Sequence, residues 1–150
     1  MIAQQTSGET LWTGDCYDRI ERTLSEFRQH SASSSIAVSY PRDIARMIDY
    51  VHDHLFDSSL NVNGLKAGCR LRNNNVTTRF RQRVGMGLRE YIEKLRLEAA
   101  ARLLMQREIA VYLVAMAVGY EHYETFFRAF QRYFGCTPSD VRLRGGWVGS

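Results

Sequence analysis

The chain has 150 residues, of which 45% are hydrophobic, and its formal net charge is +4. This length favours one domain or two very small ones, and the hydrophobic content excludes a disordered chain. No apolar run approaches the ~20 residues of a membrane span, and the N-terminus lacks a signal-peptide pattern. We therefore expect a cytoplasmic protein with no membrane partner.

The positive charge is concentrated in one part of the chain. Between positions 58 and 84 there is no acidic residue, and the basic residues there are Lys66, Arg70, Arg72, Arg79, Arg81 and Arg83. Residues 1–40, in contrast, are net acidic. This basic segment predicts a polyanionic partner, and a well-solvated helix face is the alternative.

Apolar residues at helical spacing begin after a polar leader. They predict a helix over residues 15–30 that buries Tyr17, Ile20, Leu24 and Phe27. This helix must dock on the rest of the chain or on a second copy, because it cannot bury its apolar stripe alone. The serine-rich residues 31–35 are predicted to form a flexible connector and mark the candidate domain boundary.

Pro41 opens the next predicted helix, which has Asp43 in its first turn. Its inward stripe is predicted to be Ile44, Ile48, Val51 and Leu55. His52 and His54 have no evident partner in the sequence, so we expect them to face solvent or a neighbouring carbonyl.

A short helix, a turn and a second helix then follow over residues 60–85. Any of Asn73, Asn74 and Asn75 can cap the second helix, and Val76, Phe80 and Val84 are predicted to point inward. The outward side chains are then Asn74, Thr77, Thr78 and Arg81, with the ends of Arg79 and Arg83. A helix pair with a polar, basic outer face is typical of the helix-turn-helix motif.

The same pattern returns about 50 residues later. A short apolar helix over residues 111–118 leads to Gly119, which is placed for a left-handed turn, and to a second helix over residues 122–134. Phe126, Phe130 and Phe134 are predicted to point inward, whereas Tyr123, Glu124, Thr125 and Arg128 point outward. Aligning Phe80 with Phe130 also aligns Gly85 with Gly135.

A long helix is predicted between these two units. Residues 88–105 contain no Gly or Pro, and one stripe comprises Leu88, Ile92, Leu95, Ala99 and Leu103. Such a helix is roughly 27 Å long. The sequence thus predicts an all-α fold in which a rigid helix joins two similar units.

Other chemistries find little support in the sequence. Cys16, Cys69 and Cys136 form no CxxC pair and have no histidine at ligand spacing, which predicts buried or idle thiols and no metal site. There is no carboxylate pair, Cys–His arrangement or glycine-rich phosphate loop, so we expect neither an enzyme nor a cofactor.

The order of motifs in the second half resembles a known family. The motifs are YIEKLRLEAA from Tyr91, Val118-Gly119-Tyr120, Phe126-Phe127-Arg128-Ala129-Phe130 and Phe134-Gly135-Cys136-Thr137-Pro138-Ser139. With them, residues 41–142 resemble the DNA-binding domain of the AraC/XylS family of bacterial transcription regulators. The resemblance implies two helix-turn-helix subdomains on a long central helix, which read successive major-groove segments of double-stranded DNA.

The resemblance also implies roles for individual residues. The base-reading positions fall on Asn74, Thr77, Thr78, Tyr123, Glu124, Thr125 and Arg128. Arg70, Arg72, Arg79, Arg81 and Arg83 are candidates for phosphate contacts, and Arg96 is expected to make a structural or backbone contact. Lys66 and Arg70 replace the family's usual Ala and Gly, which suggests a reshaped first turn.

These observations predict an N-terminal extension over residues 1–40, a DNA-binding domain over 41–144 and a flexible tail over 145–150. The implied function is that of a sequence-specific transcription regulator, an activator that contacts RNA polymerase. The protein is expected to be either a monomer or a dimer formed through its N-terminal helix. The first 40 residues are too few for a ligand-sensing domain. Either the regulator is therefore controlled by its abundance, or the chain is a fragment of a longer ligand-sensing regulator. Given the altered first unit, an all-α protein-interaction module that has lost DNA binding is the other alternative.

Overall fold

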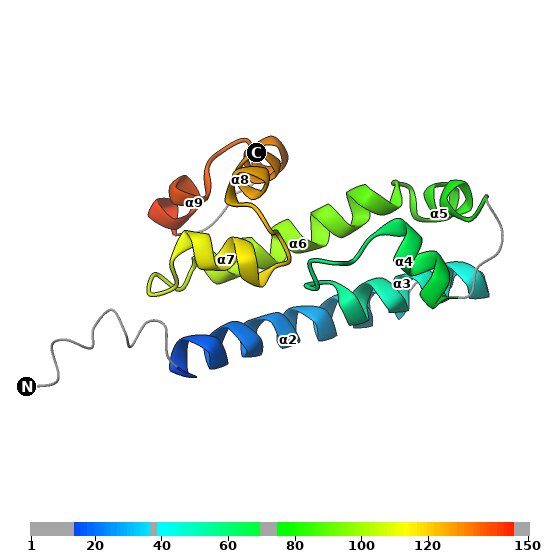
Figure 1. Ribbon diagram of the computed structural model, residues 1–150, viewed down its shortest axis with the longest axis horizontal. Helices are drawn as coiled ribbons and strands as arrows, with labels where there is room; N and C mark the ends of the chain where they lie inside the picture. Colours follow the sequence, from blue (N-terminus) through cyan, green and yellow to red (C-terminus); the bar gives the residue numbers. More distant parts are fainter. Residues whose placement is uncertain (1–13, 37–38, 70–74, 146–150) are drawn as a thin grey trace, which may run out of the picture.

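The computed structural model describes residues 14–36, 39–69 and 75–145, and within these ranges every regular element is a helix (Figure 1). The helices are α2 (Gly14–Ile36), α3 (Arg42–His54), α4 (Val62–Gly68), α5 (Val76–Val84), α6 (Leu88–Leu104), α7 (Val111–Ala117), α8 (Tyr123–Phe134) and α9 (Pro138–Arg144). The predicted all-α architecture is confirmed, with two helix-turn-helix units, a central helix and an N-terminal helix. No helix in the described ranges is long and apolar enough to span a membrane.

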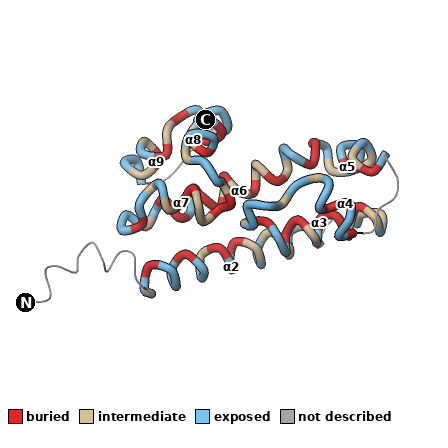
Figure 2. Tube along the Cα trace, in the orientation of Figure 1, coloured by how far each residue is buried: buried red, intermediate tan, exposed pale blue. Residues whose placement is uncertain are grey.

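Helix α6 is the centre of the fold, because α2, α5, α7, α8 and α9 all pack against it (Figure 1). All five residues of its predicted stripe are buried. Leu97 and Ala100 are also fully buried, although they lie off that stripe. A helix covered on several sides buries more than one face, as the distribution of buried positions along α6 shows (Figure 2).

Helix α2 is longer than the sequence predicts, and the predicted connector is wrong. Residues 31–35 continue the helix to Ile36 instead of forming a flexible link. No Gly or Pro interrupts them, and the Ser34 hydroxyl donates to the His30 carbonyl oxygen at 3.1 Å, one turn back. Serine hydroxyls are able to bond to the backbone in this way within a helix.

The buried stripe of α2 is Cys16, Ile20, Leu24 and Phe27, so Cys16 takes the place predicted for Tyr17. Tyr17 is 53% exposed. All three cysteines are buried free thiols, as predicted.

The docking of α2 on the body is confirmed, and its contacts reach both halves of the molecule. Near its start, Arg19 pairs with Glu108, and Thr23 Oγ1 accepts from Gln106 Nε2 at 2.8 Å; both partners follow α6. Near its end, Arg28 Nη1 donates to the carbonyl oxygen of Asp53 in α3 at 3.2 Å. Helix α2 therefore contacts both α3, at the first unit, and the segment between α6 and α7, at the second.

His52 is buried, contrary to the prediction that it faces solvent or a neighbouring carbonyl. Its Nε2 lies 3.0 Å from the hydroxyl of Tyr91 on α6, a partner that is 39 residues away and not evident from the sequence. Burial lowers the pKa of His52 from 6.5, and nearby Asp49 and Asp53 act in the opposite direction. The neutral imidazole is therefore the form that the fold favours.

Acid should weaken the fold through His52. Because its folded pKa lies below its unfolded pKa, its contribution to stability is complete above about pH 6.5 and is lost as the pH falls toward the folded pKa. The slope from this one proton is at most about 1.4 kcal/mol per pH unit. Chemical denaturation of the wild type and His52→Leu between pH 7.5 and 5 should show a shallower decline in the variant. Equal slopes in the wild type and in His52→Leu would contradict this assignment.

Candidate nucleic-acid interface

The first helix-turn-helix unit consists of α4 and α5, with α3 behind them. Asn61 caps α4 by accepting from the Gly64 amide at 2.8 Å, and Asn75 holds the cap position of α5 without a capping bond from its side chain. Gly85 ends α5 in the left-handed conformation, with φ of 93°. The interior contacts of α5 come from Val76 and Phe80, which are 1% and 0% exposed.

Gly68 ends α4 where the ring of Tyr50 crosses from α3. A Cβ at position 68 would lie 2.3 Å from Cε2 of that ring. The close approach of the Tyr50 ring therefore gives a physical reason for a glycine at this position.

Gly68→Ala is expected to destabilise the protein by about 1–3 kcal/mol, because the added methyl group overpacks the site. In a Tyr50→Ala background the same substitution should cost little, since alanine is the better helix former once the ring is absent. Thermal unfolding of the four proteins in this cycle measures the coupling. A cost for Gly68→Ala that is unchanged without Tyr50 would show that the ring is not the cause.

The outer face of α5 carries the predicted polar residues. Thr78, Arg81 and Arg83 are exposed, whereas Thr77 is half-buried. Arg79 pairs with Asp43 of α3, so part of its charge is already neutralised within the protein. Asn74, Arg70 and Arg72 lie outside the described residues.

Arg89 joins this face, although it was not among the residues predicted to bind DNA. It lines the same cleft, of about 380 Å³, as Thr77, Thr78 and Arg81. The sequence feature that could have identified Arg89 as a surface residue near α5 is its position off the apolar stripe of α6, soon after the basic segment. The side chain is exposed and is suited to an anion approaching α5.

The second unit consists of α7 and α8, with α9 closing it. Gly119 has φ of 104°, as the predicted left-handed turn requires, and Gly135 ends α8 with φ of 76°. Tyr120 packs edge-on against Phe126 at 5.4 Å between ring centroids, and burial raises its pKa to about 12. The core stripe of Phe126 and Phe130 is fully buried.

The outer face of α8 carries Glu124, Thr125 and Arg128, all exposed. Arg128 Nη2 lies 3.8 Å from Glu124 Oε2, and the two side chains are 77% and 85% exposed. Such a surface pair holds its partners weakly, so Arg128 remains available to a ligand. Tyr123 differs from the others because it is half-buried and packs against Phe126 and Phe127, with 6.1 Å between ring centroids in each case.

Arg96 links the two units through α6. Its Nε and Nη2 donate to the carbonyl oxygens of Leu55 and Asp57, at 2.8 and 2.7 Å, in the segment that precedes α4. Its guanidinium also lies 5.9 Å from the ring centroid of Tyr120 in the second unit. The expected structural role of Arg96 is thus confirmed. A Cβ at position 119 would lie 2.9 Å from Arg96 Cζ, so this contact also depends on Gly119.

The outer faces of α5 and α8 approach the same side of α6. Arg89 and Glu93 are four residues apart and share one face of that helix. Arg89 lines the cleft beside α5, and Glu93 pairs with Arg132 of α8 at 3.2 Å. Helix α2 packs on the opposite side from α8 (Figure 1).

The two outer faces differ in charge. Arg81, Arg83 and Arg89 on the first have no ion-pair partner among the described residues. On the second, Arg128 and Arg132 are each near a glutamate. The first face is therefore the stronger attractor of a polyanion.

Comparisons with known proteins agree with this geometry. The model of a family described as "Helix-turn-helix domain" matches residues 70–144. Regulatory protein SoxS of Salmonella typhimurium is 33% identical over 107 residues, which are 71% of this chain and 99% of the relative. The Msm operon regulatory protein of Streptococcus mutans is 26% identical over 136 residues, which are 89% of this chain and 48% of the relative.

The chain thus spans nearly all of SoxS but only about half of the streptococcal relative. Among solved structures, the C-terminal domain of AraT, a response regulator from Geobacillus stearothermophilus, superimposes with a TM-score of 0.68 at 22% identity. That match covers 75% of this chain and 93% of the AraT domain. With its two helix-turn-helix units on one central helix, the chain belongs to the AraC-type family of DNA-binding transcription regulators.

Proposed function

We propose that the chain reads an asymmetric DNA site by placing α5 and α8 in two successive major-groove segments of one duplex. The observation that carries this proposal is that two similar units present exposed polar faces beside the same side of α6. A rigid helix of 17 residues, roughly 26 Å long, is suited to two readers about one DNA turn apart.

The first unit supplies most of the affinity. Its phosphate contacts come from Arg70, Arg72, Arg81 and Arg83, with Arg89 added from α6. Arg79 contributes less because it is paired with Asp43. Asn74, Thr77 and Thr78 face the bases, where Asn is able to pair with adenine and Thr to touch a thymine methyl group.

The second unit supplies most of the discrimination. Arg128 reads guanine through its O6 and N7 atoms, the commonest specific contact between proteins and DNA. Thr125 and Tyr123 face neighbouring bases. Glu124 accepts from a cytosine amino group or, by repelling phosphate, restricts how α8 enters the groove.

The remaining features of the function follow from the family resemblance. The protein acts in the bacterial cytoplasm as an activator and contacts RNA polymerase. One copy suffices to read an asymmetric site, since one chain carries both readers.

Selection of bound duplexes from a random DNA pool tests the proposed function. We expect a preferred site of two short segments about one turn apart, bound with an affinity that falls steeply as salt increases. Recovery of unrelated sequences, or binding insensitive to salt, would favour a protein-interaction module instead. Size-exclusion chromatography of the complex should give one chain per duplex, and two chains would assign a dimer.

A further inference from the structure

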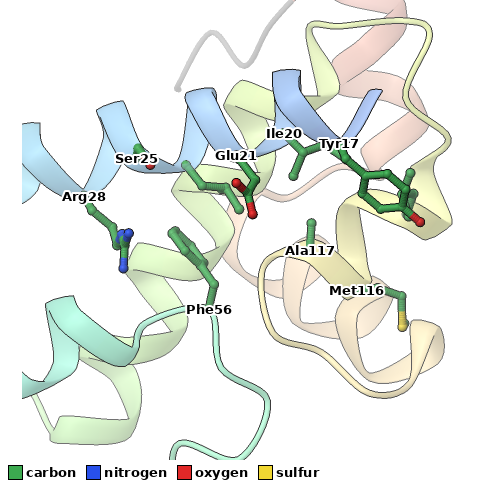
Figure 3. Close-up of a pocket in the computed structure, with 10 residues that line it drawn as sticks. Tyr17, Ile20, Glu21, Ser25, Arg28, Phe56, Met116 and Ala117 are labelled. Atoms are coloured by element: carbon green, nitrogen blue, oxygen red, sulfur yellow. The ribbon is translucent and has the colours of Figure 1, made fainter. Parts of the chain in front are cut away.

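An open cleft of about 590 Å³ lies on the side of the molecule where α2 meets both units (Figure 3). Helix α2 forms one wall, Phe56 from the first unit forms the second, and Met116 and Ala117 of α7 form the third. Small-molecule sites typically measure about 300–1,000 Å³ and often lie where structural units meet. The cleft is therefore of a suitable size and place for a ligand.

The lining is mainly apolar and has few polar groups. Ile20, Leu24, Phe56, Leu113, Met116 and Ala117 provide the apolar surface. Tyr17 lies at one end beside Met116, and Phe56 lies toward the other end, so two aromatic rings bracket the cleft (Figure 3). The polar groups are the side chains of Glu21, Ser25 and Arg28.

The two charged side chains of the cleft, Glu21 and Arg28, differ in their positions and in their bonding partners. The carboxylate of Glu21 extends between Phe56 and Ala117, and no described residue forms an ion pair with it (Figure 3). Arg28, at the far end, already donates to the carbonyl oxygen of Asp53 at 3.2 Å. Arg28 keeps its positive charge but lies at the end of the cleft, so the charge in the middle of the cleft is that of Glu21.

From this arrangement we infer that the cleft binds an organic cation with a bulky apolar body. The apolar body would fill the space among Leu24, Phe56 and Ala117, and the cationic centre would lie near the Glu21 carboxylate. Tyr17 and Phe56 add to this preference, because aromatic faces attract cations that have lost part of their hydration. A ligand held there contacts α2 and both units together.

Tetraphenylphosphonium and tetraphenylborate test this inference, because they have nearly the same shape and opposite charge. Their binding to the whole chain is measured by isothermal titration calorimetry in a potassium-free sodium buffer, without DNA. We expect the phosphonium ion to bind more tightly than the borate ion. The net charge of +4 would favour the anion, so a preference for the cation must come from local groups.

Two variants locate the binding site, and a third provides the control. Glu21→Gln should weaken phosphonium binding about three- to fivefold, as expected for a partly solvated ion pair. Ala117→Phe, which fills the cleft, should weaken it further. Glu26→Gln removes an exposed carboxylate of the same helix that does not line the cleft, and it should leave binding unchanged.

Three results would overturn the inference: no binding of the phosphonium ion, equal or tighter binding of the borate ion, or equal effects of Glu21→Gln and Glu26→Gln. Because Glu21 is exposed, its substitution leaves the fold intact and the test does not depend on Ala117→Phe being stable. The measurement uses no DNA, so its outcome is separate from that of the proposed function.

Discussion

Arg128→Ala is expected to lower the affinity for the preferred DNA site by about 1–3 kcal/mol, or roughly 5- to 150-fold. Affinity for random DNA should change far less. The reason is geometric: Arg128 is 77% exposed on the outer face of α8, and a bidentate contact with guanine depends on the base that it meets. Fluorescence anisotropy with the selected duplex, and with the same duplex altered at single base pairs, measures the loss at each position.

The matched variant is Arg81→Ala on the first unit. Since Arg81 is proposed to bind phosphate, its loss should weaken binding to specific and random DNA alike and reduce the salt slope by about one. Arg22→Ala, on the exposed surface of α2, should change neither. If Arg128→Ala and Arg81→Ala affect both kinds of DNA equally, the proposed division of roles between the two units is wrong.

Arg96→Met should lower the free energy of unfolding by about 2–3 kcal/mol. The substitution keeps an apolar stem but removes the donors to the Leu55 and Asp57 carbonyl oxygens and the contact with Tyr120. Chemical denaturation measures the loss. Hydrogen exchange should also show faster opening on both sides of the lost contact, in the segment before α4 and in the turn at Gly119.

Two further variants of α6 control this prediction. Arg96→Lys keeps the charge but lacks the forked geometry that reaches two carbonyl oxygens, so it should recover only part of the stability. Arg89→Ala removes an exposed arginine of the same helix and should change stability by less than about 0.5 kcal/mol. Full recovery by lysine would mean that charge, and not the bridging geometry, stabilises the fold.

The repeated pattern made the two units predictable from the sequence. Phe80 and Phe130 are both fully buried, Gly85 and Gly135 both end helices in the left-handed conformation, and Gly119 has the predicted turn geometry. Helical spacing and glycine placement are local signals, and here the tertiary structure agrees with them. The exposed positions of Thr78, Glu124, Thr125 and Arg128 follow from the same spacing.

Several features that the sequence did not predict depend on contacts between distant residues. His52 is buried because Tyr91 offers its hydroxyl from α6, and Arg79 is drawn toward Asp43 of α3. The position of Arg89 in the cleft beside α5 likewise depends on how α5 packs against α6. Helical periodicity within one element carries no information on such partners. It also gave no reason to bury Cys16 in place of Tyr17, since both lie near the same stripe.

Methylation protection of guanine N7 tests the central claim most directly, since that atom lies in the major groove. On a selected duplex we expect two clusters of protected positions about one helical turn apart on the same face, with one chain bound. Arg128→Ala should remove protection in one cluster and leave the other. A single cluster, or two clusters on opposite faces of the duplex, would contradict the account.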